Sequence, residues 1–153
     1  MRILIDADAC PVKEETIKIG EYYGVDVIMV TTTDHYSSHI IDSKYLQVIY
    51  IEPGIEAVDY YLLSIAKKDD IVVTQDYGLA SLLFSKYKVI HHSGKVYDEF
   101  NIDQLLFERH LGQKMRKAGK KNKGTGKFTK DDRDRFVESL SRIIEDSEQE
   151  SHK

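Results

Sequence analysis

The sequence has little cysteine, tryptophan and proline, and it has no long apolar run. Its 153 residues include one cysteine, Cys10, which excludes an intrachain disulfide, and two prolines, which exclude a collagen-like or proline-rich chain. No stretch approaches ~18 uncharged apolar residues, and near the N-terminus only three apolar residues lie between Arg2 and Asp6. We therefore expect a cytoplasmic globular protein that makes no contact with a membrane.

Charge is distributed unevenly along the chain. The formal net charge is −4, yet residues 109–130 contain nine of the 22 Lys and Arg residues and no acid. This basic, glycine- and lysine-rich segment could bind the phosphates of a nucleic acid, or it could be a solvated loop that binds nothing. The residues predicted to contact nucleic acid are Arg109, Lys114, Arg116, Lys117, Lys120, Lys121, Lys123 and Lys127.

Predicted strands and helices alternate along the chain. Short apolar runs predict strands over residues 2–5, 25–30, 47–51, 71–74 and 89–91. Apolar spacing and end signals predict helices over residues 11–23, 55–66, 79–84, 102–109 and 136–144. This order indicates the α/β class, as a three-layer sandwich with a mainly parallel central sheet, C-terminal helices and the basic segment. We expect residues 1–147 to form this single domain and residues 148–153 to be a frayed tail.

Acidic residues follow two of the predicted strands. Asp6 and Asp8 come after the first strand, and Asp76 comes after the fourth. Asp59 lies on the helix before that fourth strand, with Glu56 one turn earlier on the same face. Ligands of parallel sheets bind at the carboxyl ends of the strands, where converging carboxylates repel one another unless a cation is present. Oxygen ligands select Mg²⁺ or Mn²⁺, so Asp6, Asp8, Asp59 and Asp76 are predicted to form a metal site that hydrolyses phosphodiesters.

These acids also have other interpretations. Asp8 could cap a helix that starts at Pro11, Asp76 could cap the following helix, and Asp6 could be a turn residue. A haloacid-dehalogenase-like phosphatase would use the first Asp of an Asp-x-Asp pair as its nucleophile and the second as its acid/base. That family prefers Thr or Val where this chain has Cys10. The metal site and the phosphatase therefore stay as alternative enzymatic hypotheses.

Two strings carry a resemblance to a known family. DADACPVK at residues 6–13 resembles the signature of the YaiI/YqxD family of uncharacterised bacterial proteins. The resemblance continues through TQDYGLA at residues 74–80 to Arg109, Gly119 and Phe136, so it covers nearly the whole chain. It implies a fold similar to the PIN domain, which is a metal-dependent ribonuclease fold.

The resemblance to the PIN pattern implies roles for individual residues. Asp6, Asp59 and Asp76 occupy the places of the PIN acids, and Thr74 is the partner hydroxyl. PIN nucleases commonly have another acid shortly after the Thr-x-Asp, whereas residues 77–80 of this chain contain none. Two residues could replace that ligand, Asp8 or Glu56, and Lys13 is predicted to support the site.

The resemblance therefore implies a nuclease that depends on Mg²⁺ or Mn²⁺ and acts on RNA rather than DNA. The basic segment at residues 109–130 would hold the nucleic acid through its phosphates. The main alternative is a non-enzymatic RNA-binding or regulatory module in which the acids are inert. The sequence does not determine the oligomeric state, and a homo-oligomer is possible.

Overall fold

The computed structural model describes residues 1–33, 42–117, 119 and 127–151. Strands and helices alternate in chain order, as the apolar pattern predicts. The elements are β1 (Arg2–Asp6), α1 (Lys13–Tyr23), β2 (Asp26–Thr32), β3 (Leu46–Ile51), α2 (Ala57–Ile65), β4 (Ile71–Val73), α3 (Tyr77–Leu83), β5 (Lys88–Ile90), α4 (Glu99–Lys117) and α5 (Lys130–Ser151).

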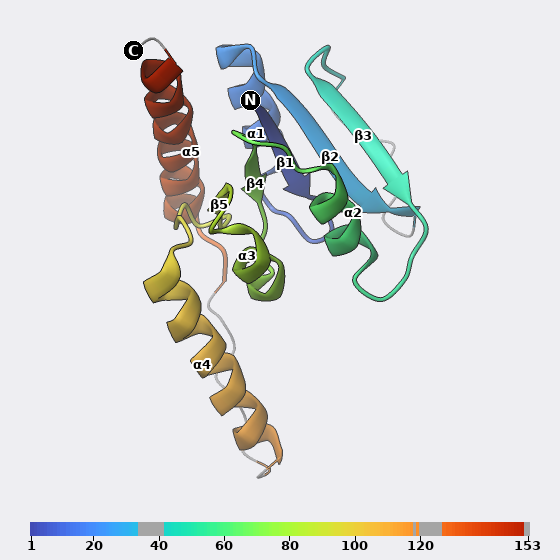
Figure 1. The fold of residues 1–153 in the computed structure, drawn as a ribbon, viewed down its shortest axis with the longest axis vertical. Coiled ribbons are helices and arrows are strands. Elements are labelled where there is room, and N and C mark those ends of the chain that lie inside the picture. Colours follow the sequence, from blue (N-terminus) through green and yellow to red (C-terminus); the bar gives the residue numbers. More distant parts are fainter. Residues whose placement is uncertain (34–41, 118, 120–126, 152–153) are drawn as a thin grey trace.

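The five strands form one parallel sheet in the order β3-β2-β1-β4-β5. Ile5 of β1 is in register with Met29 of β2 on one side and with Val73 of β4 on the other. From β1 the chain builds outward to β3, and it then returns to place β4 on the free side of β1 (Figure 1). The strand order therefore reverses between β1 and β4, and such a switch point is where open parallel sheets bind ligands.

Alternating side chains of the sheet build two cores, one on each face. Ile3 and Ile5 pack with residues of α1 and α5, including Ile17, Phe136 and Leu140. Leu4 points to the opposite face, where it packs with residues of α2, α3 and α4. Helices thus cover both faces of the sheet, and the predicted three-layer α/β sandwich is confirmed.

The first helix differs from its prediction at one end. Gly24 ends α1 in a left-handed conformation with φ 66°, as expected for a glycine cap. The helix begins at Lys13, however, and not at Pro11, because Val12 occupies the N-cap position without a side-chain bond. The prediction of a helix from Pro11 is therefore wrong by two residues.

The C-terminal helices are longer than their apolar spacing predicts. Helix α4 runs from Glu99 to Lys117, so the first part of the basic segment is helical and not a loop. Lys and Arg are good helix formers, which explains the extension. The middle of that segment, residues 120–126, lies outside the described residues. Helix α5 continues to Ser151, so residues 148–151 are helical where we expected a frayed tail.

None of the helices in residues 1–33, 42–117 and 127–151 is both long and apolar enough to cross a membrane.

Candidate functional site

A cavity of about 330 Å³ lies outside the carboxyl ends of β1 and β4, at the switch point of the sheet. The structure brings together there all five acids that the sequence singled out. The lining residues are Asp6, Asp8, Thr32, Gly54, Glu56, Ala57, Val58, Asp59, Gln75 and Asp76. No Lys or Arg is among these lining residues, so the described wall of the cavity carries acidic charge only.

Thr74 fixes the two acids that end the central strands. Its Oγ1 donates to Asp6 Oδ2 at 2.9 Å and accepts from the backbone N–H of Asp76 at 3.0 Å. Its backbone carbonyl accepts from the hydroxyl of Tyr97 at 3.1 Å. Because Thr74 is buried, this chain of hydrogen bonds ties β1 to the segment after β4 and holds Asp6 beside Asp76.

Asp76 caps helix α3. Its Oδ1 accepts from the backbone N–H groups of Gly78 at 2.8 Å and Leu79 at 3.2 Å, so the capping interpretation is right for this residue. The cap does not remove the residue from the cavity, because Asp76 lines it and its charge, after burial, raises the pKa of Asp59. The cap therefore positions a carboxylate that also belongs to the acidic site.

Asp8 is held by the neighbouring strand β2 and not by a helix. Its Oδ1 accepts from Thr31 Oγ1 at 2.7 Å and from the backbone N–H of Thr32 at 3.2 Å. Helix α1 has no side-chain cap bond, so the alternative in which Asp8 caps that helix is wrong. Asp8 instead joins the ends of β1 and β2 at the edge of the cavity.

Two of the carboxyl groups have strongly raised pKa values. Burial raises the pKa of Asp6 to about 6, against the hydrogen bond from Thr74, and the charges of Asp8 and Asp76 add to the increase. Burial, followed by the charges of Asp76 and Asp6, raises the pKa of Asp59 to about 7. A cluster that resists ionisation in this way needs protons or a cation to neutralise it.

The described acids do not form a closed protein cage for a metal ion. Within the described ranges, no group of three or more His, Cys, Asp or Glu side chains is placed to hold a metal ion. Mg²⁺ is usually held by one or two carboxylates and keeps several water molecules. Asp6 with one neighbouring carboxylate could hold Mg²⁺ or Mn²⁺ in that manner.

Backbone strain borders the same cavity. Ala9 has φ 60° and Glu56 has φ 56°, which are left-handed values that residues with a Cβ rarely adopt. Ala9 directly follows Asp8, and Glu56 lines the cavity. Such strain tends to gather at functional sites. Sequence reasoning missed this feature, because neither residue is a glycine and no local signal marks it.

Of the residues predicted to support the site or to contact nucleic acid, Lys13 does not line the cavity and Arg109 lies next to it. Lys13 begins α1 and is absent from the lining, so the structure does not place it in the supporting role predicted for it. A Cβ built on Gly78 would lie 3.1 Å from Asp76 Oδ1 and 3.9 Å from Nη1 of Arg109, so the Arg109 guanidinium lies beside the Asp76 end of the cavity.

The remaining basic residues divide by their place in the chain. Lys114 and Lys127 are exposed. Lys120, Lys121 and Lys123 lie outside the described residues, as do the side chains of Arg116 and Lys117. Their predicted contacts with nucleic acid stay predictions.

Cys10 is close in sequence to the acids but has the chemistry of a structural thiol. Burial raises its pKa to about 11, and the nearby Lys13 charge opposes that effect without reversing it. Reactive cysteines have lowered pKa values, so we assign Cys10 no catalytic role.

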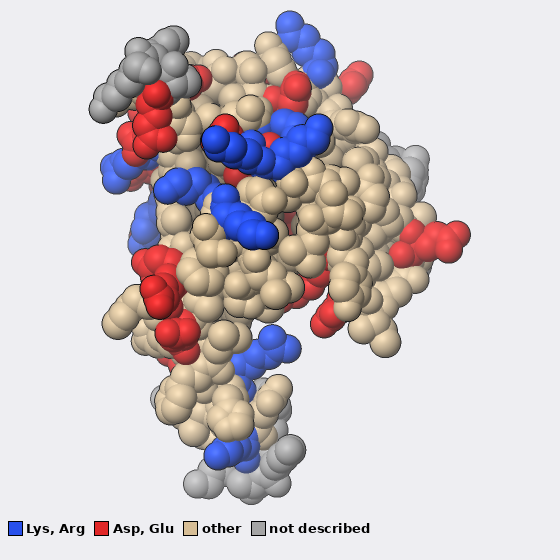
Figure 2. Space-filling view, in the orientation of Figure 1, with Lys and Arg blue, Asp and Glu red and all other residues tan. Residues whose placement is uncertain are grey.

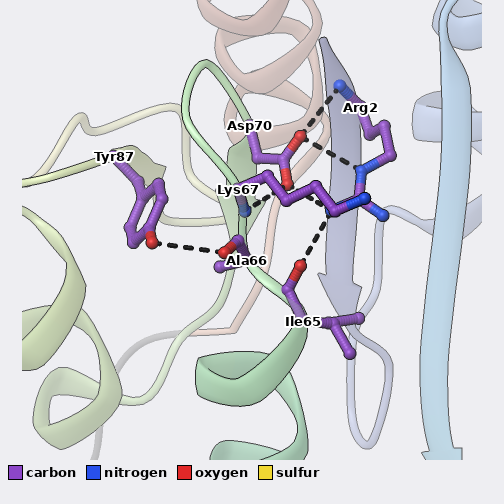
Figure 3. Close-up of polar contacts among 6 residues, drawn as sticks. All are labelled: Arg2, Ile65, Ala66, Lys67, Asp70 and Tyr87. Atoms are coloured by element: carbon purple, nitrogen blue, oxygen red, sulfur yellow. Dashed lines mark hydrogen bonds and ion pairs between the residues drawn. The ribbon is translucent and has the colours of Figure 1, made fainter.

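A buried acid at the opposite end of the strands has a structural role (Figure 3). Asp70 precedes β4 and is 2% exposed. Its carboxylate accepts from the backbone N–H of Arg2 at 3.2 Å, from Arg2 Nη2 at 2.6 Å and from the backbone N–H of Lys67 at 2.8 Å. Arg2 Nη2 also donates to the carbonyl of Ile65 at 2.9 Å. These bonds join the start of β1 to the turn between α2 and β4.

Comparison with known proteins assigns the family. The model of the family described as "Uncharacterized BCR, YaiI/YqxD family" matches residues 4–146. The chain belongs to the YaiI/YqxD family. It is 47% identical over 145 residues to a UPF0178 protein of Oceanobacillus iheyensis, covering 94% of this chain and 99% of the relative. It is 42% identical over 143 residues to a UPF0178 protein of Staphylococcus aureus strain MRSA252, covering 93% of each chain.

Membership of the YaiI/YqxD family confirms the resemblance seen in the two sequence strings. A UPF0178 protein of Staphylococcus haemolyticus is a further relative, 41% identical over 144 residues that cover 94% of this chain and 97% of the relative. No solved structure matches the chain significantly. The likeness to the PIN domain therefore stays a prediction, and the function has to be argued from the acidic cavity itself.

The raised pKa of Asp59 predicts an effect on stability in metal-free protein. A carboxyl whose pKa is higher in the folded state, here about 7 against 3.8, lowers stability progressively as the pH rises from about 4 to about 7. Asp59→Asn removes that penalty. In chelator we expect its melting temperature to exceed that of the wild type by roughly 2–4 °C at about pH 8, and by little at about pH 5. This corresponds to about 1 kcal/mol, a modest value because the side chain is partly exposed.

Differential scanning fluorimetry of both proteins across this pH range would measure the effect. His91, whose pKa is lowered by burial to about 4, destabilises the fold as the pH falls, but it acts equally in both proteins and cancels in the difference. Asp134→Asn, at an exposed position of α5, controls for loss of a surface charge. An equal gain in melting temperature at both pH values would contradict the view that ionised Asp59 destabilises the fold.

Proposed function

We propose that the acidic cavity binds Mg²⁺ or Mn²⁺ and hydrolyses phosphodiester bonds of RNA. One observation supports this above the others. Carboxylates from β1, from α2 and from the segment after β4 meet at the switch point of a parallel sheet, and two of them have strongly raised pKa values. Structural acids in a protein are usually paired with cations or with backbone donors alone, and a cluster of this kind resembles a site built for an external cation.

Each acid of the cavity would have a different role in binding the cation and the attacking water. Asp6 and Asp76 are the primary candidates to hold the cation, since Thr74 and the α3 cap fix their positions. Asp59 lines the same cavity, and the charge of Asp76 contributes to its raised pKa, so it would orient the attacking water. Asp8 and Glu56 line the rim and could complete the coordination through water. A bound divalent cation would lower the pKa of water and neutralise charge on the phosphodiester.

Arg109 supports a polyanionic substrate. It is exposed, it forms no ion pair with a described acid, and its guanidinium lies beside the Asp76 end of the cavity. An unpaired guanidinium next to a carboxylate site can hold a phosphate adjacent to the one that is cleaved. The preference for RNA comes from the PIN resemblance, and the geometry itself requires only a phosphodiester.

Calorimetric titration of Mn²⁺ into chelator-stripped protein tests the site directly. We expect saturable binding in the wild type and a loss of at least about 10-fold in affinity in Asp76→Asn. Asn is also a good N-cap, so this variant removes a ligand charge while the backbone bonds to Gly78 and Leu79 can still form. Asp134→Asn is the matched control and should bind Mn²⁺ like the wild type.

The same titration distinguishes the non-enzymatic alternative. If a folded wild type binds no Mn²⁺, the metal site is wrong and the acids act only as cap and turn residues. If RNA then binds in the presence of chelator, and neutralising Lys120, Lys121 and Lys123 abolishes that binding, the basic segment is the functional region. The protein would then be an RNA-binding module without nuclease activity.

A further inference from the structure

Helix α4 exposes an apolar stripe on the face opposite to the one that packs on the protein. Asn101 and Ile102 are buried, and Leu105 packs against the core shared with α2 and α3. On the far side, Phe100 is 81% exposed, Phe107 is 65% exposed and Leu111 is 47% exposed. Spacings of seven and four residues place these three on one helical face. Single exposed apolar residues are ordinary, but an aligned stripe marks an interaction surface.

Charge along the outer side of α4 changes sign from one end to the other. Glu99 and Asp103 flank the start of the stripe, whereas Lys114 flanks its end, and all three are exposed. In Figure 2 acidic atoms gather around the beginning of α4, uncharged surface covers its middle, and basic atoms lie toward its end. Figure 1 shows the second half of the helix projecting away from the sheet, where a partner can reach it.

Two copies of α4 have complementary charges only when they run antiparallel to each other. A two-fold axis through Phe107 would place Lys114 of one copy opposite Phe100 of the other, within one turn of that copy's Glu99 and Asp103. Parallel pairing would instead bring acid to acid and base to base. The charges thus favour the antiparallel arrangement, with Phe107 as the apolar residue at its centre.

We propose that α4 pairs with α4 of a second copy in an antiparallel, two-fold symmetric dimer centred on Phe107. Leu111 would pack near Asp103 of the second copy at each end of the apolar contact, and Lys114 would pair with Glu99 or Asp103. Lys114 therefore serves the interface in this arrangement, and not the nucleic acid. Arg109 lies on the side of α4 toward α3, so the pairing leaves the acidic cavity open. The dimer does not depend on the proposed nuclease activity.

Sedimentation velocity of the full chain tests the proposal. One helix pair is a small interface, so we expect a reversible dimer with a Kd on the order of 10 µM, measured between about 1 and about 200 µM protein. Phe107→Ser should weaken the dimer at least about 10-fold, because Phe107 would lie on the two-fold axis and meet its own copy. Tyr22→Ser, at a residue of α1 that is 82% exposed, is the matched control and should dimerise like the wild type.

A charge swap provides a test that does not rely on the apolar change. Asp103→Lys and Lys114→Asp should each weaken the dimer, and the double variant should recover part of the loss, because positions 103 and 114 again carry opposite charges across the two-fold axis while Glu99 is unchanged. Circular dichroism confirms that each variant is folded. A wild type that stays monomeric at every concentration would overturn the proposal and leave the stripe to a different protein partner. A double variant as weak as the single ones would overturn the antiparallel arrangement.

Discussion

Asp6→Asn is expected to lower the rate of RNA hydrolysis by at least about 100-fold while the protein stays folded. The substitution removes a charge that would bind the cation, and it hardly changes the side-chain volume. The amide oxygen of Asn can still accept the hydrogen bond from Thr74 Oγ1, which is 2.9 Å long in the wild type. The substitution therefore removes charge from the cavity but preserves the link between β1 and the segment after β4.

Stability measurements separate this result from simple unfolding. Burial raises the pKa of Asp6 to about 6, so the ionised carboxylate destabilises metal-free protein above that pH. Asp6→Asn should then melt at the same temperature as the wild type in chelator at neutral pH, or at a higher one. Cleavage of an unstructured RNA in Mn²⁺ gives the rates, and Asp134→Asn should retain full activity. Undiminished cleavage by Asp6→Asn would show that the acidic cavity is not the catalytic site.

Sequence patterns were sufficient to predict the layers of the fold, because each strand and helix has a local pattern of apolar residues. Ile3, Leu4 and Ile5 form an apolar run buried on both faces, which is typical of a central parallel strand. The strand order could not be predicted, because no local feature determines that β4 pairs with β1 and not with β3. That pairing creates the switch point and thus the cavity.

The two acids that looked like helix caps show why the site could be predicted only in part. Asp8 and Asp76 each precede a helix by a short distance, and from sequence alone both could cap one. Asp76 does so, whereas Asp8 is bound by Thr31 and Thr32 of the adjacent strand. The difference arises from strand pairing, a contact between residues far apart in the chain, which local spacing cannot reveal.

Asp70→Asn is expected to cause the largest loss of stability of any change considered. The carboxylate of Asp70 is 2% exposed and faces only donors, those of the Arg2 side chain and of two backbone N–H groups. Hydrogen bonding with Asp70 raises the pKa of Arg2, and because arginine stays protonated in proteins, the guanidinium is still charged when Asp70 is replaced. An amide NH₂ placed against these donors leaves a partly buried charge without compensation. We expect a cost of about 2–4 kcal/mol, the lower part of the range for buried pairs because Arg2 is partly exposed.

Chemical denaturation with urea would measure this cost, and Asp69→Asn is a control at the adjacent position. Asp69 is exposed and has φ 72°, a conformation that Asn tolerates well, so its substitution should be neutral or slightly stabilising. If the unpaired Arg2 is the cause, Arg2→Met should recover part of the loss when combined with Asp70→Asn. The pair lies at the amino ends of β1 and β4, away from the cavity at their carboxyl ends, so folded Asp70→Asn should still bind Mn²⁺ like the wild type. A loss of Mn²⁺ affinity in the folded variant would instead mean that the two ends of the sheet are energetically coupled.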